Sequence, residues 1–233
     1  MCGYFITKFF QLPKRDYEMK FAVIGNPIEK SLSPQLHEIL YEKLNILNCS
    51  FEKIHIENDE LDDFFNNDFD LFNGINVTIP FKSEVVKFLD FIDEEAKILG
   101  NINCISKSNN MTYGFNTDKY GFDMLLNKNN VSIKGSSCIV LGAGSSAKTV
   151  VKSLIDHGAD KIVIKNKSID NAHDLRHFAH NLGFKNIELF NSDFSNFDVA
   201  INTTPIGMYK DDKDNFFDIP VGKNTSLIDL IYT

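Results

Sequence analysis

Cysteine is scarce in this sequence of 233 residues, which holds only four. Cys2, Cys49, Cys104 and Cys138 are scattered and form no Cys-X-X-Cys pair and no Cys/His group with the spacing of zinc ligands. The pattern favours buried, reduced thiols over disulfides or a structural metal. The chain also begins without a convincing secretory signal peptide, so we expect a cytoplasmic protein with no metal centre.

Long apolar runs are missing too. The longest runs, such as Cys138 to Gly144, have the length of a strand and fall far below the ~20 residues that cross a bilayer. Basic charge is in deficit, because 24 Lys and Arg face 32 Asp and Glu, which gives a formal net charge of −8. Nucleic-acid binding needs a concentrated basic surface, so neither a membrane nor a nucleic acid is the expected partner. A small anionic metabolite is compatible with this charge, since a few groups in a cleft suffice to bind it.

Strand and helix patterns alternate from residue 21 onward, which predicts an α/β fold. In the first block we expect strands at 21–25, 50–56 and 74–79, with a helix and loop at 58–72. A further helix is expected to have Ser33 as its N-cap and Pro34 as its first residue. Its apolar residues are spaced for one buried face; they are Leu36, Ile39, Leu40 and Leu44.

The second block begins near Ile133 and repeats the alternation. A buried strand at 136–141 leads into a glycine turn, and a helix at 145–158 follows and is closed by Gly158. A strand at 161–166 and a helix at 168–182 come next. Further strands are expected near 187–190, 198–202 and 226–231. A helix at 117–128 connects the two blocks.

The glycine turn matches the fingerprint of a dinucleotide site. The segment Gly142-Ala143-Gly144-Ser145-Ser146-Ala147 follows a predicted strand and opens a predicted helix. The first glycine permits the tight turn, the second lets the backbone approach a pyrophosphate, and the small Ala147 permits close helix packing. A purely structural glycine turn is the alternative, and the strand–turn–helix context disfavours it.

The end of the next strand favours NADP over NAD. NAD-specific enzymes usually carry Asp or Glu there, which binds the ribose 2′-hydroxyl. This chain has Asn166, Lys167 and Ser168, and Lys167 is suited to pair with a 2′-phosphate. A solvated surface lysine is an equally good interpretation of Lys167 taken by itself.

Three polar segments of the first block occur where strands end, which is where α/β folds collect ligands. They are Ser31-Leu-Ser33-Pro34, the segment Asn76 to Lys82, and Asn116-Thr117-Asp118. Each has a plainer explanation: Ser33 and Asp118 as helix caps, Asn76 and Thr78 as partners of the backbone at a strand end, Asn116 as a turn residue, and Lys82 as a surface lysine.

Taken together these segments resemble the shikimate dehydrogenase family. That family has the patterns SxSP, NVTxPFK and NTD in this order, then a GAGG-type cofactor loop, and Asn202 to Met208 (NTTPIGM) resembles a later signature. The resemblance runs from about Lys20 to Tyr232. It implies an N-terminal α/β substrate domain at 19–118, a connecting helix and linker at 119–130, and a Rossmann-like NADP-binding domain at 131–233. Independently of the resemblance, Met19 directly precedes the strand-like run Lys20 to Ile24, so we expect residues 1–18 to be an extension and Met19 the functional start.

The resemblance also implies a reaction and the residues that carry it. The reaction is the reversible, NADPH-dependent reduction of 3-dehydroshikimate to shikimate, in aromatic amino-acid biosynthesis. Lys82 would exchange the proton with the substrate oxygen and Asp118 would orient it, because hydride transfer to a ketone needs such an acid. The substrate carboxylate would contact Ser31, Ser33 and Tyr232, and the substrate hydroxyls Thr78, Asn103 and Asn116. Cofactor contacts would come from Gly142 to Ala147, Asn166, Lys167, Ser168, Thr203 and Met208.

The chain departs from the family pattern at several positions. Ser145 replaces a usual glycine, Lys148 a common arginine, Cys104 a usual threonine, and Lys119 a glycine that often follows the NTD motif. Lys167 replaces an arginine of the phosphate clamp, and a lysine lacks the planar fork that grips phosphate with two bonds. Asn171 stands in place of the clamp's second arginine.

Family members also continue past Tyr232, whereas this chain stops at Thr233. A truncated copy with weak or no activity is therefore one hypothesis. Two further hypotheses are a quinate/shikimate dehydrogenase that uses NAD and a catalytically silent nucleotide-binding remnant.

Overall fold

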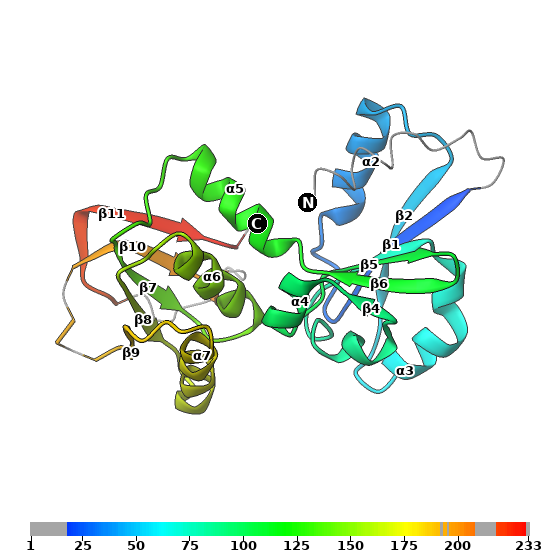
Figure 1. Ribbon diagram of the computed structural model, residues 1–233. Coiled ribbons are helices and arrows are strands. Elements are labelled where there is room, and N and C mark those ends of the chain that lie inside the picture. Colours follow the sequence, from blue (N-terminus) through cyan, green and yellow to red (C-terminus); the bar gives the residue numbers. More distant parts are fainter. Residues whose placement is uncertain (1–17, 192, 195, 208–217, 232–233) are drawn as a thin grey trace. The chain divides into compact units, whose positions relative to one another are not determined.

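The computed structural model describes residues 18–191, 193–194, 196–207 and 218–231. It divides into two units, the first ending at Asn116 and the second beginning at Thr117 (Figure 1). Both units are α/β, as the sequence predicts. The predicted extension, apart from its last residue, and the predicted site residues Met208 and Tyr232 lie outside the described part. The finer division with a linker at 119–130 stays a prediction.

The first unit is built on a mixed six-stranded sheet in the order β2-β1-β3-β5-β6-β4. β1 (Met19–Gly25) lies between β2 (Cys49–His55) and β3 (Gly74–Val77) and runs parallel to both. β5 (Cys104–Ser108) and β6 (Met111–Phe115) form an antiparallel hairpin beside β3. The short β4, Phe91–Ile92, completes the sheet next to β6.

Helix α2 (Ser33–Lys43) corrects two predictions. It begins at Ser33 itself, which follows the N-cap position Leu32, and no side chain caps it. None of its residues is buried, and the side chains of the predicted buried face are 41–57% exposed. α2 packs at the outer edge of the sheet, where the ring of His37 stacks on that of Phe51 with centroids 3.9 Å apart. The spacing of the apolar residues indicates a helix, but it does not reveal which face the sheet covers.

The acidic, phenylalanine-rich segment after β2 forms short helical turns that cover the sheet. α3 (Leu61–Asp63) continues into a π-helical turn (Phe64–Asp68) and a 3₁₀ turn (Phe69–Leu71). Their buried side chains pack on those of β1 and β3 and on Phe81, which is completely buried. A 3₁₀ turn at Glu84–Phe88 and helix α4, Glu94–Leu99, precede the hairpin.

The second unit carries a five-stranded parallel sheet in the order β11-β10-β7-β8-β9. Four of its strands agree with the predicted ones to within one residue: β7 Ser137–Leu141, β8 Lys161–Lys165, β9 Ile187–Leu189 and β10 Phe197–Asn202. The last, β11 (Val221–Asp229), begins well before the predicted start at 226. Helix α5 (Asp118–Lys128) precedes β7, α6 (Ser145–Asp156) connects β7 to β8, and α7 (Ile169–Asn181) connects β8 to β9.

The central strands of this sheet are buried on both faces, as parallel strands usually are. Alternate residues of β7 belong to two separate apolar clusters: Cys138 and Val140 to one, Ile139 and Leu141 to the other. The first cluster contains the apolar faces of α5, α6 and α7, so these three helices cover the same face. The second is smaller and is flanked by the partly buried Phe190, Phe194, Ile206 and Ile219.

Candidate functional site

The predicted substrate residues of the first unit converge on one end of its sheet, where β1, β3 and β6 finish. β1 and β3 are parallel, and β6 runs in the same direction as β3 because both are antiparallel to β5. Their carboxyl ends therefore lie at the same end of the sheet. The segments that follow these three strands contain Ser31, Thr78 and Asn116. Asn103 reaches the same end because β5 begins there, and its backbone carbonyl accepts a hydrogen bond from Val77 N–H at 2.9 Å.

Ser31 and Ser33 lie in a turn just before α2. The hydroxyl of Ser31 is 3.2 Å from that of Ser33 and accepts a hydrogen bond from the backbone N–H of Ser33 at 3.3 Å. Ser33, the predicted N-cap, is instead the first helical residue, and its own N–H bonds to the Ser31 hydroxyl. Two hydroxyls side by side at the start of a helix are suited to donate to an anion.

Thr78 is fixed against the end of β1. Its backbone N–H donates to the carbonyl of Ile24 at 2.9 Å, which continues the pairing of β1 with β3. A Cβ placed on Gly25 would lie 2.4 Å from Thr78 Cγ2. Only a glycine at position 25 therefore leaves room for Thr78, a requirement that sequence reasoning missed.

Lys82 follows Thr78 on a rigid turn. The preceding residue, Phe81, is fully buried and donates its N–H to the carbonyl of Thr78 at 3.1 Å. The carbonyl of Lys82 accepts a hydrogen bond from Ile102 N–H at 2.7 Å. The backbone of Lys82 is thus held from both sides, which is what a catalytic side chain needs for a defined position.

Asn116 is buried and makes an amide–amide contact that the sequence did not predict. Its Nδ2 donates to Oδ1 of Asn101 and to the carbonyl of Asn101 at 3.3 Å. Asn101 is itself buried, only 2% exposed. The first asparagine of the segment Asn101-Ile102-Asn103, two positions before Asn103, is the sequence signal that would have indicated it.

The glycine loop has the geometry that a dinucleotide requires. Gly142 follows β7 with φ of +109°, a conformation that only glycine adopts readily, and a Cβ there would lie 2.5 Å from Thr203 Oγ1. Gly144 precedes the first turn of α6, and no atom lies within 4 Å of the place where its Cβ would be. The loop therefore leaves space at the N-terminus of α6, where backbone N–H groups attract an anion.

Thr203 joins this loop from the neighbouring strand. Its hydroxyl donates to the carbonyl of Leu141 at 2.7 Å, and its N–H donates to the same oxygen at 2.9 Å. The predicted cofactor residues 142–147 and Thr203 are thus brought together at the carboxyl end of β7 and β10, where ligands bind in open α/β sheets.

The segment after β8 places Lys167 between two residues that bond to each other. Asn166 Nδ2 donates to the carbonyl of Ser168 at 2.8 Å. The hydroxyl of Ser168 accepts the N–H of Asn171 at 3.3 Å and so caps α7, which accounts for a serine at this position without a cofactor. The roles of Asn166, Lys167 and Ser168 toward NADP stay predictions.

Asp118 is the first residue of α5 and belongs to the second unit, whereas Lys82 belongs to the first. Their pairing stays a prediction. Within the described residues no group of three or more His, Cys, Asp or Glu side chains is arranged to hold a metal ion. No helix in the described part is long and apolar enough to span a membrane.

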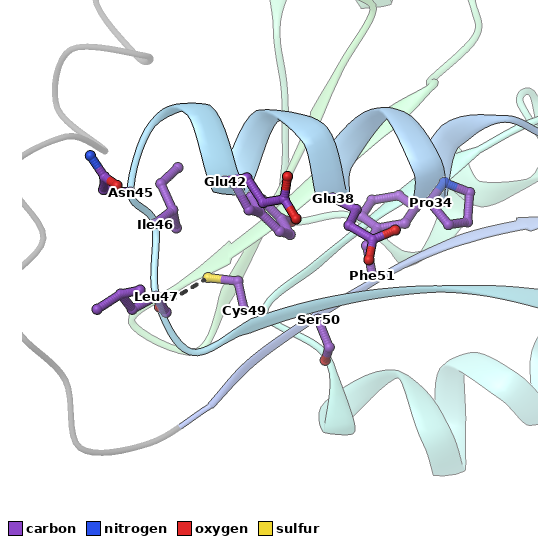
Figure 2. Close-up of a pocket in the computed structure, with 10 residues that line it drawn as sticks. Pro34, Glu38, Glu42, Asn45, Ile46, Leu47, Cys49, Ser50 and Phe51 are labelled. Carbon is purple, nitrogen blue, oxygen red and sulfur yellow. Dashed lines mark hydrogen bonds between the residues drawn. The ribbon is translucent and has the colours of Figure 1, made fainter.

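A pocket of about 530 Å³ lies between α2 and β2 (Figure 2). It is lined by residues of α2, of β2 and of the turn between them, including Glu38, Tyr41, Glu42, Cys49 and Phe51. Burial, with a smaller contribution from Cys49, raises the pKa of Tyr41 to about 12. None of the residues predicted to bind substrate or cofactor lines it.

Comparison with known proteins agrees with this geometry. Residues 23–105 match the shikimate dehydrogenase substrate binding domain, and residues 124–230 match the shikimate/quinate 5-dehydrogenase family. The shikimate dehydrogenase (NADP(+)) of Clostridium beijerinckii is 38% identical over 215 residues, which cover 91% of this chain and 77% of that protein.

Solved structures give the same result. The crystal structure of the Aquifex aeolicus shikimate dehydrogenase superposes with a TM-score of 0.84 at 31% identity, covering 95% of this chain and 82% of that one. The Thermus thermophilus shikimate 5-dehydrogenase, solved in complex with NADP(H) and shikimate, superposes with a TM-score of 0.72 at 28% identity, covering 81% and 69%. The predicted family is confirmed: this chain belongs to the shikimate dehydrogenase family of NADP-dependent oxidoreductases.

Proposed function

We propose that this chain catalyses the reversible, NADPH-dependent reduction of 3-dehydroshikimate to shikimate. The observation that carries the proposal is the gathering of Ser31, Thr78, Lys82, Asn103 and Asn116 at one end of the first sheet, in a chain of this family. The second unit supplies a glycine loop with space for a pyrophosphate at the start of α6.

The polar groups of the first unit suit a hydroxylated carboxylate. The paired hydroxyls of Ser31 and Ser33 would donate to the substrate carboxylate. Because the amide nitrogen of Asn116 donates to oxygens of Asn101, Asn116 would offer its amide oxygen to a substrate hydroxyl. Thr78 and Asn103 would contact the remaining hydroxyls, and Tyr232 the carboxylate.

Lys82 is the residue to which we assign proton transfer. NADPH, when bound, supplies the hydride, and the residues for holding it are Gly142 to Ala147, Asn166, Lys167, Ser168, Thr203 and Met208. As the substrate ketone gains negative charge, the ε-ammonium of Lys82 would donate a proton to its oxygen, and in the reverse direction the neutral amine would accept it. Asp118 would accept a hydrogen bond from the same part of the substrate and favour the charged form of the lysine.

Cys49 and Cys138 are reduced thiols, which fits a reducing compartment, and we place the reaction in the cytoplasm.

Replacing Lys82 tests the assignment. We expect Lys82→Ala to lower kcat by roughly 10²-fold or more, the usual cost of losing a general acid–base, with little change in melting temperature. Lys87→Ala is the matched control, because Lys87 is an exposed lysine of the following 3₁₀ turn that pairs with Asp62 at 2.5 Å. Turnover within about 2-fold of wild type in Lys82→Ala would remove this lysine from the mechanism.

A further inference from the structure

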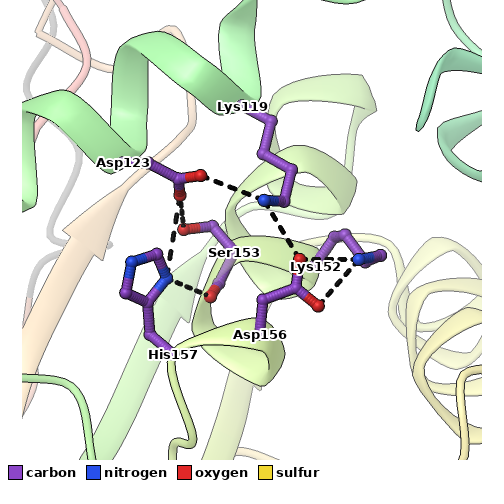
Figure 3. A network of polar contacts seen from close by, with 6 residues as sticks. All are labelled: Lys119, Asp123, Lys152, Ser153, Asp156 and His157. Atoms are coloured by element: carbon purple, nitrogen blue, oxygen red, sulfur yellow. Dashed lines mark hydrogen bonds and ion pairs between the residues drawn. The ribbon is translucent and has the colours of Figure 1, made fainter. Parts of the chain in front are cut away.

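Polar side chains link helices α5 and α6 of the second unit (Figure 3). Lys119, in the first turn of α5, places its ammonium 3.0 Å from Asp123 of its own helix and 3.0 Å from Asp156 at the end of α6. The side chain of Lys119 is only 13% exposed. It therefore bridges the two helices from a largely buried position.

A second polar connection lies beside the first. The hydroxyl of Ser153, a completely buried residue of α6, donates to Oδ1 of Asp123 at 2.5 Å. Nδ1 of His157 lies 3.7 Å from the same oxygen. The Asp123 carboxylate thus contacts Lys119 of α5 and Ser153 of α6. The contact between α5 and α6 therefore combines hydrogen bonds and ion pairs with the packing of Phe122 and Leu126.

The charged groups at this contact stabilise one another's ionised forms. Burial by itself lowers the pKa of Lys119, but the hydrogen bonds and charges of Asp123 and Asp156 outweigh it, so the pKa lies above its ordinary value. Burial likewise raises the pKa of Asp156, and Lys152 and Lys119 together outweigh it, so the net shift is downward. A partly desolvated ion pair contributes little net stability, and its better-attested effect is to fix one geometry.

The bridge from Lys119 to Asp156 is placed to anchor the first turn of α5 on α6. The buried apolar residues of the helix, Phe122 and Leu126, lie about one and two turns further along. Lys119 is the second residue of the helix, directly after Asp118, and it carries the contact of this turn with Asp156 of α6. Any shift of this turn away from α6 would move the Asp118 carboxylate with it.

We infer that Lys119, through its bridge to Asp156, is a positioning residue that holds Asp118 in place for the reaction. The inference rests on the proposed function for the role of Asp118, while the anchoring of the turn is independent of it. Misplacing a catalytic group by about 1 Å costs up to ~10²-fold in rate, so a local shift of one helical turn is sufficient for a measurable effect.

The two lysines that bind Asp156 offer a matched pair of variants. Lys152 contacts both oxygens of Asp156, at 2.7 and 2.6 Å, but lies on the same helix, and it is also 13% exposed. We expect Lys119→Met to lower kcat about 10-fold while the dissociation constant for NADPH and the melting temperature change no more than in Lys152→Met. Lys119→Arg should restore most of the turnover, because it keeps the charge across the helices.

Hydrogen exchange measured by mass spectrometry on the same full-length variants examines the anchor directly. Amides of the first turn of α5 should exchange faster in Lys119→Met than in Lys152→Met, with α7 unchanged in both. Equal exchange in the two variants, or equal losses of kcat, would overturn the inference. If the wild type does not turn over shikimate, the proposed function fails by itself, and the exchange comparison still decides whether Lys119 anchors the turn that carries Asp118.

Discussion

Replacing Gly25 by alanine examines how the end of β1 positions Thr78. The new Cβ would lie 2.4 Å from Thr78 Cγ2 and 2.9 Å from the carbonyl oxygen of Ile79, whereas ordinary contacts begin near 3.4 Å. Thr78 must therefore move by about 1 Å, because the backbone oxygen blocks the other direction. Overpacking of this kind costs about 1–3 kcal/mol, which corresponds to a fall in melting temperature of roughly 2–12 °C for a chain of this length.

The effect on catalysis follows from the displacement of Thr78. If Thr78 contacts a substrate hydroxyl, a shift of about 1 Å should lower kcat/KM for shikimate about 10-fold or more, mostly through KM. The affinity for NADPH should stay within about 2-fold of wild type, since the glycine loop belongs to the other unit.

Gly121→Ala is the control for this variant. Gly121 lies inside α5, and no atom lies within 4 Å of the place of its Cβ, so alanine should leave activity unchanged and stabilise the helix by about 0.5–1 kcal/mol. Steady-state kinetics and thermal unfolding of both variants decide the matter. A folded Gly25→Ala enzyme with an unchanged KM for shikimate would refute the contact assigned to Thr78.

Two further variants examine the cofactor site. Lys167→Ala should raise the KM for NADP about 10-fold or more while leaving the KM for NAD nearly unchanged, because a charge-assisted hydrogen bond to the 2′-phosphate contributes about 1.5–3 kcal/mol. An equal rise in the KM of both cofactors would show that Lys167 does not recognise the 2′-phosphate. Gly142→Ala should weaken NADPH binding, measured by fluorescence titration, about 10-fold or more and lower the melting temperature. The φ of +109° at this position disfavours alanine by about 1–3 kcal/mol, and the new Cβ would displace the Thr203 hydroxyl. Wild-type affinity in this variant would show that the loop does not need this glycine.

The cofactor loop was predictable from sequence because its determinants are local. A buried strand, two glycines and a helix lie within about 20 consecutive residues, and the strand, the tight turn and the helix each follow from residues at their own positions. The strands and helices of the second unit follow the same rule, since parallel strands buried on both faces are nearly continuous apolar runs.

Features that depend on distant residues were not predictable in the same way. The apolar spacing of α2 indicates a helix, but exposure of Leu36 and Leu40 depends on where the sheet edge lies. The hairpin of β5 and β6 was missed because its strands contain no continuous apolar run, and β5 is placed by its pairing with β3 and β6 by its pairing with β5. Asn101, Gly25 and Lys119 acquire their roles only through Asn116, Thr78 and Asp156, which lie 15 or more residues away in the sequence.

Oxidation of shikimate by the purified chain, followed as NADPH absorbance with NADP and NAD compared in parallel and quinate as the competing substrate, tests the central claim most directly. The account predicts turnover of shikimate that is faster with NADP than with NAD and faster than that of quinate. Faster turnover of quinate with NAD, or cofactor binding without any turnover, would contradict it.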